Sequence, residues 1–160
     1  MSYTRLRYHI VFATKGRQAW LSEEIREFLY PVFGRIAKNE GGRLLEAGGV
    51  EDHVHLICAI KPTVAVSDFI GRLKANSTGA LKRNFEQLGA FEWQGEFSCF
   101  TADPANMDKL RSYVANQVEH HRNGDLWELY EFIATSDGDE DDDGGGEEDE
   151  EAEEAVETLE

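Results

Sequence analysis

The chain has 160 residues, enough for one domain with a hydrophobic core and too few for two ordinary domains. Its net charge of −16 would by itself argue against nucleic acid as a partner. That charge is unevenly distributed, however. Residues 1–133 carry all 16 basic residues and 17 acidic ones, and the other 15 acidic residues follow. The body is therefore near neutral, and nucleic-acid binding stays open for it.

Residues 134–160 are acidic and contain no aromatic residue. Self-repulsion and the lack of apolar surface predict a disordered tail beside a folded domain at 1–133. Two roles are open for this tail. It is either a solvating extension, or a phosphate mimic that competes for a basic groove of the body.

Nothing in the sequence indicates export or a membrane. A charged start followed by an apolar stretch is missing, and no apolar run approaches membrane-spanning length. Cys58 and Cys99 lack the spacing of a zinc knuckle or a redox motif, which predicts buried thiols. We expect a cytoplasmic protein with no membrane partner.

The first half of the body alternates predicted strands with one helix. Residues 6–13 are rich in aromatic and branched residues, which predicts a strand. Ser22, followed by two acidic residues, predicts a helix start, and Gly41-Gly42 predicts a left-handed turn at its end. Two strands, 43–47 and 54–60, then form a predicted hairpin.

The second half continues with a helix that opens near Ser67 and a loop and short strand over 91–101. A third helix then starts at Asp103-Pro104 and carries Tyr113, Gln117 and His121 on one broad face. The whole order predicts an α+β, ferredoxin-like fold of the split β-α-β kind. Its antiparallel sheet should carry helices on one face, with an added C-terminal helix.

His53 and His55 lie two residues apart within a predicted strand, so their side chains point to the same face. Two imidazoles on one rigid face can bind a single metal ion. Asp52 can orient one of them, as acidic neighbours of metal-binding histidines do. The alternative is a pair of half-buried histidines on the polar face of a strand.

Tyr113 and Gln117 are four residues apart on the third predicted helix and therefore share one face. A phenol and an amide oxygen at that spacing can reach the same metal-bound phosphate. The pair alone is a weak signal, because this spacing is common on amphipathic helices. Its weight comes from the two histidines.

Taken together, these motifs resemble the single-tyrosine HUH transposases of bacterial insertion sequences, the IS200-like family, in which an apolar residue separates two histidines. The resemblance spans roughly residues 3–122. The matching stretches, in chain order, are residues 8–12, Lys15 and Arg17, residues 49–56, Leu73 and Lys74 with Ser77, and residues 113–121.

The resemblance implies a metal-dependent transposase that cleaves and rejoins single-stranded DNA at hairpin-marked ends. Tyr113 would attack a phosphodiester and stay joined to the 5′ phosphate. His53, His55 and Gln117 would hold Mg²⁺ or Mn²⁺. Because this ligand set is neutral, we expect weak metal binding until a DNA phosphate adds a ligand, and tighter binding of Mn²⁺ than of Mg²⁺.

The resemblance further implies a homodimer in which the tyrosine helix of one subunit can complete the histidine site of the other. Basic side chains suit a groove that follows the DNA backbone, and Phe91 or Trp93 could stack an unpaired base. The ordinary alternative is a solvated helix face for the charges and a core position for the aromatic rings. The basic candidates are Lys15, Arg17, Arg72, Lys74, Lys82 and Arg83.

Two other functions remain compatible with the sequence. One is a noncatalytic, ferredoxin-like nucleic-acid-binding module, which would need neither metal nor Tyr113 for binding. The other is a domesticated nickase that processes hairpins without moving its own gene. The acidic tail and the acidic segment 92–98 depart from the family pattern, which puts DNA affinity and target choice in doubt.

Overall fold

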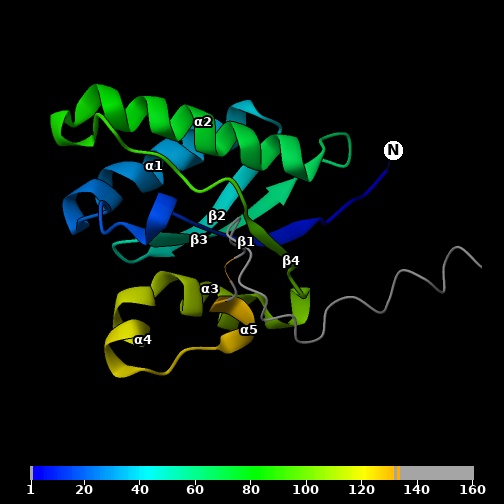
Figure 1. Cartoon of the computed structure of the whole chain (residues 1–160). Helices are drawn as coiled ribbons and strands as arrows, with labels where there is room; N and C mark the ends of the chain where they lie inside the picture. The colour runs from blue at the N-terminus through cyan, green and yellow to red at the C-terminus, as the bar shows by residue number, and fades with distance from the viewer. Residues whose placement is uncertain (1, 132, 134–160) are drawn as a thin grey trace, which may run out of the picture.

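The computed structural model describes residues 2–131 and 133, and it shows a sheet between two helical layers (Figure 1). The strands are β1 (Arg7–Ala13), β2 (Gly42–Gly49), β3 (His53–Ile60) and β4 (Ser98–Thr101), in the spatial order β2-β3-β1-β4. All neighbouring strands are antiparallel. The predicted α+β, ferredoxin-like antiparallel sheet is confirmed.

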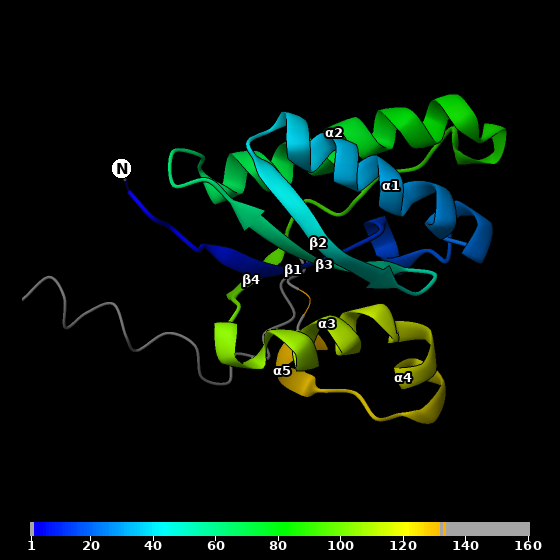
Figure 2. The same ribbon diagram turned by 180° about the vertical axis from the view of Figure 1, so that it is seen from behind.

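The two helical layers cover opposite faces of the sheet, as Figures 1 and 2 show from front and back. The first layer holds α1 (Glu23–Asn39) and α2 (Val66–Asn84). The second holds α3 (Met107–Ala115), α4 (Gln117–Asn123) and α5 (Glu128–Glu131). Short 3₁₀ turns are η1 (Lys15–Arg17), η2 (Glu86–Leu88) and η3 (Pro104–Asn106).

Strand β3 is buried on both faces, and its alternation divides the core in two. Val54, Leu56 and Cys58 belong to the main core beneath α1 and α2. Ile57 belongs to a smaller cluster with α3. Because side chains alternate along a strand, His53 and His55 share the face of Ile57. The two histidines therefore lie in the layer of α3, away from the main core.

The predicted boundaries of α1 agree with its local chemistry. The Ser22 hydroxyl accepts a hydrogen bond from the Ile25 amide at 3.4 Å, which caps the first turn. Gly41 has a φ of 86°, the left-handed conformation predicted for the chain after this helix. Cys58 is fully buried as predicted, whereas Cys99 is only partly buried.

Helix α3 lies unusually close to β2. It packs on Ile57 through Met107, Leu110 and Val114. A Cβ atom added to Gly48 would lie 2.7 Å from the carbonyl carbon of Val114, closer than real Cβ contacts allow. The absent side chain of Gly48 therefore lets the backbone of α3 rest against the sheet.

The third predicted helix is interrupted. The sequence predicts one helix carrying Tyr113, Gln117 and His121, but the structure ends α3 at Ala115 and starts α4 at Gln117. Asn116 between them has φ −105° and ψ 31°, and its side chain donates to the Ser112 carbonyl at 2.8 Å. Asparagine side chains that bond to the backbone in this way are typical of helix ends.

Within the described residues, no helix is both long and apolar enough to cross a membrane. The acidic tail predicted over 134–160 lies outside the described residues.

Candidate active site

His53 and His55 are each held through the same ring nitrogen. Nδ1 of His53 lies 2.7 Å from Oδ1 of Asp52, as the sequence suggested. Nδ1 of His55 lies 2.9 Å from Nε2 of His9, a residue on the neighbouring strand β1. Contacts of this kind fix the orientation of an imidazole and direct its other nitrogen. Both Nε2 atoms are thereby aimed at a common point.

At that point lies the carboxylate of Glu131, which comes from α5. Its Oε2 atom is 3.3 Å from Nε2 of His53 and 3.4 Å from Nε2 of His55. The two histidine side chains are 1% and 0% exposed. One ligand atom from each of the three residues lies within 4.8 Å of the others, so the group is able to hold a metal ion.

Tyr113 lies beside these histidines. Its ring centroid is 6.2 Å from that of His55, and its ring stacks on Trp127 at 4.4 Å. The hydroxyl donates to Oε1 of Glu131 and accepts a hydrogen bond from the Trp127 amide at 3.1 Å. Burial, together with the hydrogen bond to Glu131, raises the pKa of Tyr113 to about 12.

Gln117 is buried next to the tyrosine. Its Nε2 atom donates to the Tyr113 carbonyl at 3.1 Å. Its Oε1 atom is buried and finds no hydrogen-bond partner in the part of the chain that the structure describes. A buried amide oxygen without a partner is costly, and it is available to a ligand.

The two histidines at 120 and 121 have different surroundings. The Nε2 atom of His121 lies 3.4 Å from Oε2 of Glu131, and its ring centroid is 5.0 Å from that of His53. His120 instead pairs with Asp125 at 3.2 Å and lies against the Tyr113 ring at 4.7 Å. His121, and not His120, therefore faces the His53 and His55 pair.

The electrostatics favour an anionic Glu131 carboxylate beside the histidines. Burial opposes ionisation of Glu131, but the close polar contacts of its carboxylate with His53 and His55 outweigh burial and hold its pKa well below the usual range. Burial lowers the pKa of His55. Burial also disfavours the charged form of His53, but the hydrogen bond to Asp52 and the nearby carboxylate of Glu131 prevail and raise its pKa.

Residues 2–117 match the family model described as "Transposase IS200 like". The chain belongs to the IS200-like transposase family. It is similar to the transposase for insertion sequence element IS200 of Salmonella typhimurium, with 31% identity over 131 residues that cover 78% of this chain and 86% of that protein. Similarity to the ISDra2 transposase TnpA of Deinococcus radiodurans is 25% over 118 residues, covering 71% and 84%.

Solved structures agree with this family. A crystal structure from Deinococcus radiodurans R1, described as a candidate transposase, superposes with a TM-score of 0.59 at 26% identity, covering 72% of this chain and 93% of that one. A REP-associated tyrosine transposase bound to a REP hairpin shares the fold, with a TM-score of 0.55 at 12% identity, covering 79% and 73%. As an IS200-like transposase, the chain is a DNA-cleaving enzyme.

Several basic residues that we predicted as DNA contacts of this transposase are engaged in ion pairs. Lys15 pairs with Glu92 at 2.7 Å. Arg17 pairs with Asp52 at 3.1 Å, which places it next to the histidine site. The third pair, between Arg72 and Glu40 at 3.2 Å, bridges α2 to the end of α1.

Lys74 supports a loop. Its ammonium group donates to the carbonyls of Gln94 and Glu96 at 2.9 and 2.6 Å. By contrast, Lys82 and Arg83 near the end of α2 form no ion pair with another described residue. These two are the predicted contacts that are most available to a phosphate.

The aromatic candidates for base stacking belong to the core. Phe91 is 0% exposed and Trp93 is 8% exposed. Trp93 packs edge-on against Phe12 at 4.7 Å, and its indole nitrogen donates to Ser77 at 3.0 Å. The structure therefore supports the ordinary alternative for both rings.

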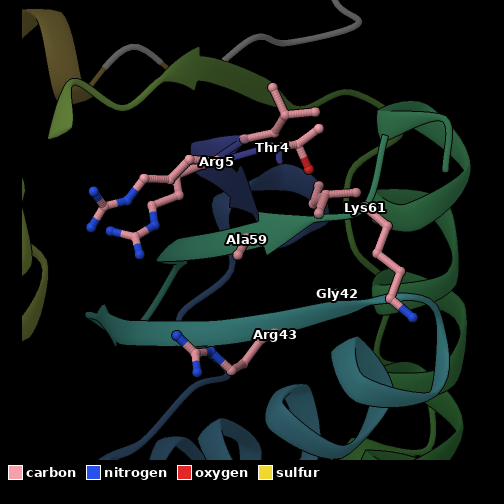
Figure 3. A pocket seen from close by; sticks show the side chains of 9 residues that line it. Thr4, Arg5, Gly42, Arg43, Ala59 and Lys61 are labelled. Carbon is pink, nitrogen blue, oxygen red and sulfur yellow. The ribbon is translucent and has the colours of Figure 1, made fainter. Parts of the chain in front are cut away.

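A basic hollow at the other end of the sheet was not predicted. Arg7 and Arg43 flank the small Ala59 on adjacent strands, and Arg5 and Lys61 also line the hollow (Figure 3). Because Ala59 is four residues along β3 from His55, the hollow lies about 13 Å from the histidines on the same face. Among the described residues, none of these four cations forms an ion pair.

Sequence reasoning also missed His9, Trp127 and Glu131. Parity along β1 and β3 could have suggested His9, because antiparallel register places it near His55. No local signal identifies Glu131, since it is one acidic residue among many and reaches the site through the turn after α4. Its residue number also lies beyond the segment that matches the family model.

Proposed function

We propose that this transposase cleaves and rejoins single-stranded DNA at hairpin-marked ends, with Tyr113 as the nucleophile and a divalent metal ion as cofactor. The observation that carries the proposal is the convergence of two fixed histidine nitrogens beside a buried tyrosine. A merely structural histidine pair would not need both rings fixed at Nδ1 with Nε2 aimed at one point.

The donor atoms fit a divalent cation. Nε2 of His53, Nε2 of His55 and Oε1 of Gln117 are buried and lack hydrogen-bond partners within the described part of the chain. We propose His53, His55 and Gln117 as ligands of Mg²⁺ or Mn²⁺. When bound, the cation would orient the scissile phosphate and offset the charge that develops in the transition state.

The protein residues perform the remaining tasks. The Tyr113 ring is fixed by its stack on Trp127 and by the two hydrogen bonds that the Tyr113 hydroxyl makes, one donated and one accepted. The Tyr113 oxygen would form a bond to phosphorus as the bond to the 3′ oxygen breaks. The phenol loses its proton in this step, and the departing oxygen gains one to become a 3′ hydroxyl. Rejoining reverses the same exchange.

Hairpin DNA is the proposed substrate because the solved REP-associated transposase of the same fold is bound to a hairpin. Backbone phosphates need cations along the path of the strand. Lys82, Arg83 and the basic hollow around Arg43 supply such cations on this chain. Lys15, Arg17, Arg72 and Lys74 stay in the proposal as contacts that would have to exchange an internal partner for a phosphate.

A homodimer remains part of the proposal, and its tyrosine could act within one subunit or across the dimer. The 6.2 Å between the ring centroids of Tyr113 and His55 in one chain supports action with the histidines of the same subunit. Mixing Tyr113→Phe subunits with His55→Ala subunits tests this arrangement. Restored cleavage would mean that dimers share their sites, and no restoration supports action within one chain.

The function is tested with a labelled pool of hairpin-bearing single-stranded DNA, Mn²⁺ and the full chain, followed by a denaturing gel. We expect a protein-linked DNA band that requires metal and disappears in Tyr113→Phe. Tyr30→Phe is the matched control, because Tyr30 is a partly buried tyrosine of the main core. DNA binding without a linked band in either metal would favour the noncatalytic binding module instead.

A further inference from the structure

We infer that Glu131 is a metal ligand of this site and that the same carboxylate positions the nucleophile. The inference rests on the proposed function, because it concerns the same metal. It adds a ligand from α5, beyond residues 2–117 that match the family model. The proposed ligand group becomes two histidines and a carboxylate, with Gln117 beside them.

The geometry around Oε2 of Glu131 calls for a cation. Three imidazole nitrogens, Nε2 of His53, His55 and His121, lie 3.3, 3.4 and 3.4 Å from this one oxygen. Despite these distances, none of the three nitrogens has a hydrogen-bond partner in the described chain. These buried nitrogens therefore lack hydrogen bonds around a single oxygen atom, and buried polar groups in proteins rarely lack a partner.

The tautomer of His53 sharpens this argument. A carboxylate only accepts hydrogen bonds, so Nδ1 of His53 carries the proton that it gives to Asp52. With the proton on Nδ1, the lone pair of Nε2 would be available to a cation. Oε2 of Glu131, 3.3 Å from this nitrogen, is placed to share that cation.

A carboxylate also gives the ligand set the negative charge that it otherwise lacks. Two imidazoles and one amide are neutral, whereas Mg²⁺ and Mn²⁺ prefer oxygen ligands that include carboxylates. Glu131 supplies one negative charge, and its side chain is only 12% exposed. The site would then bind its cation before DNA arrives, and not only with the help of a DNA phosphate.

The second oxygen of Glu131 gives the carboxylate its positioning role. Oε1 accepts the hydrogen bond of the Tyr113 hydroxyl while Oε2 faces the histidines. The segment before α5 adds a second restraint, because the Trp127 amide donates to the same hydroxyl. One short segment thus joins the metal position to the nucleophile.

The test is Mn²⁺ binding to the full chain, followed by pulsed EPR. The 15 acidic residues of the tail also attract Mn²⁺. The quantity followed during the titration is therefore the modulation of the EPR signal by imidazole nitrogen, which only Mn²⁺ bound to histidine gives. Glu131→Gln keeps the shape and removes the charge. Glu128→Gln is the matched control, because Glu128 belongs to the same helix and is exposed.

We expect Glu131→Gln to weaken histidine-bound Mn²⁺ by at least about tenfold, since even indirect partners of metal ligands cost about that much. Glu128→Gln should bind as the wild type does. A carboxylate that only plugs the site would compete with the ion, so unchanged or tighter binding in Glu131→Gln would overturn the inference. If Glu131→Gln does not fold by circular dichroism, Glu131→Asp, which retracts the oxygens, should show a weakening in the same direction.

The two proposals fail separately. Mn²⁺ binding that depends on Glu131, without any DNA-linked product, would leave the metal ligand standing and remove the nucleophile function. A DNA-linked product from Tyr113 with Mn²⁺ binding unaffected by Glu131→Gln would do the reverse. Tyr113→Phe should keep the nitrogen-modulated signal, because the phenol is not a ligand.

Discussion

Gly48→Ala should separate the nucleophile from the metal site without removing either. Gly48 lies opposite His55 in the sheet and beneath the backbone of Val114. Its new Cβ would overlap the Val114 carbonyl oxygen, its nearest neighbour, and would lie 2.7 Å from the carbonyl carbon, whereas ordinary contact begins at 3.4 Å. Helix α3, which carries Tyr113, must therefore move by more than about 1 Å to clear the oxygen.

A shift of this size matters for an in-line attack. Misplacement by about 1 Å can cost about 100-fold in rate, so we expect formation of the DNA-linked product to slow by about 10- to 100-fold. Overpacking should also lower the free energy of unfolding by about 1–3 kcal/mol. Mn²⁺ should still bind to His53 and His55, which keep their own Nδ1 contacts, but more weakly, because Gln117 and Glu131 are bonded to Tyr113 and shift with it.

The assay is the single-turnover rate of adduct formation, with urea unfolding measured on the same samples. Gly71→Ala is the control: Gly71 lies within α2 and has open space around its Cβ position. That control should react like the wild type and gain up to about 1 kcal/mol from helix propensity. A Gly48→Ala enzyme with wild-type rate and stability would refute the argument that close packing of α3 places Tyr113.

Three further predictions concern the surroundings of the site. Asp52→Ala should weaken histidine-bound Mn²⁺ by about 10- to 100-fold in the same EPR titration, because His53 loses the partner that orients it. Burial lowers the pKa of Lys74 to about 8, below the 10.5 of an unperturbed lysine. Between about pH 8 and 10.5 the unfolded chain therefore keeps the Lys74 proton while the folded chain releases it. The free energy of unfolding of the wild type, measured in urea, should rise across that range relative to that of Lys74→Met. Arg43→Ala should weaken hairpin binding and reduce its salt dependence by about one unit of slope, as measured by fluorescence anisotropy; an unchanged slope would exclude the basic hollow as a phosphate contact.

The fold was predictable because its signals are local. Apolar and branched residues identify β1, the serine cap and acidic first turn identify the start of α1, and Gly41 identifies its end. The interruption at Asn116 was not predicted, because the apolar spacing continues through it, and the hydrogen bond of its side chain to Ser112 leaves no trace in that spacing. Amphipathic spacing shows which residues face inward, but not whether the helix axis stays straight.

The candidate site was predictable where its residues lie close in sequence. His53 and His55 share a strand face by parity, and Asp52 adjoins them. His9 and Glu131 reach the site only through tertiary contacts, from 46 residues before His55 and from the segment after α4. The charge pattern of α2 also hides an internal contact. From the sequence Lys74 looks like a solvent-exposed cation on a helix, but in the structure its ammonium group bonds to the carbonyls of Gln94 and Glu96. A side chain's partner across the fold decides its role, and sequence spacing does not contain that information.

The central claim is that Tyr113 becomes covalently joined to DNA. The most direct measurement is mass spectrometry of tryptic peptides after reaction of the full chain with hairpin DNA and Mn²⁺, followed by nuclease trimming. Trypsin cleavage after Arg111 and Arg122 isolates Tyr113 from the other tyrosines of the chain. The account predicts a phosphonucleotide on the peptide that starts at Ser112, absent without metal. DNA cleavage with an unmodified Tyr113 peptide, or with the adduct on another tyrosine, would contradict it.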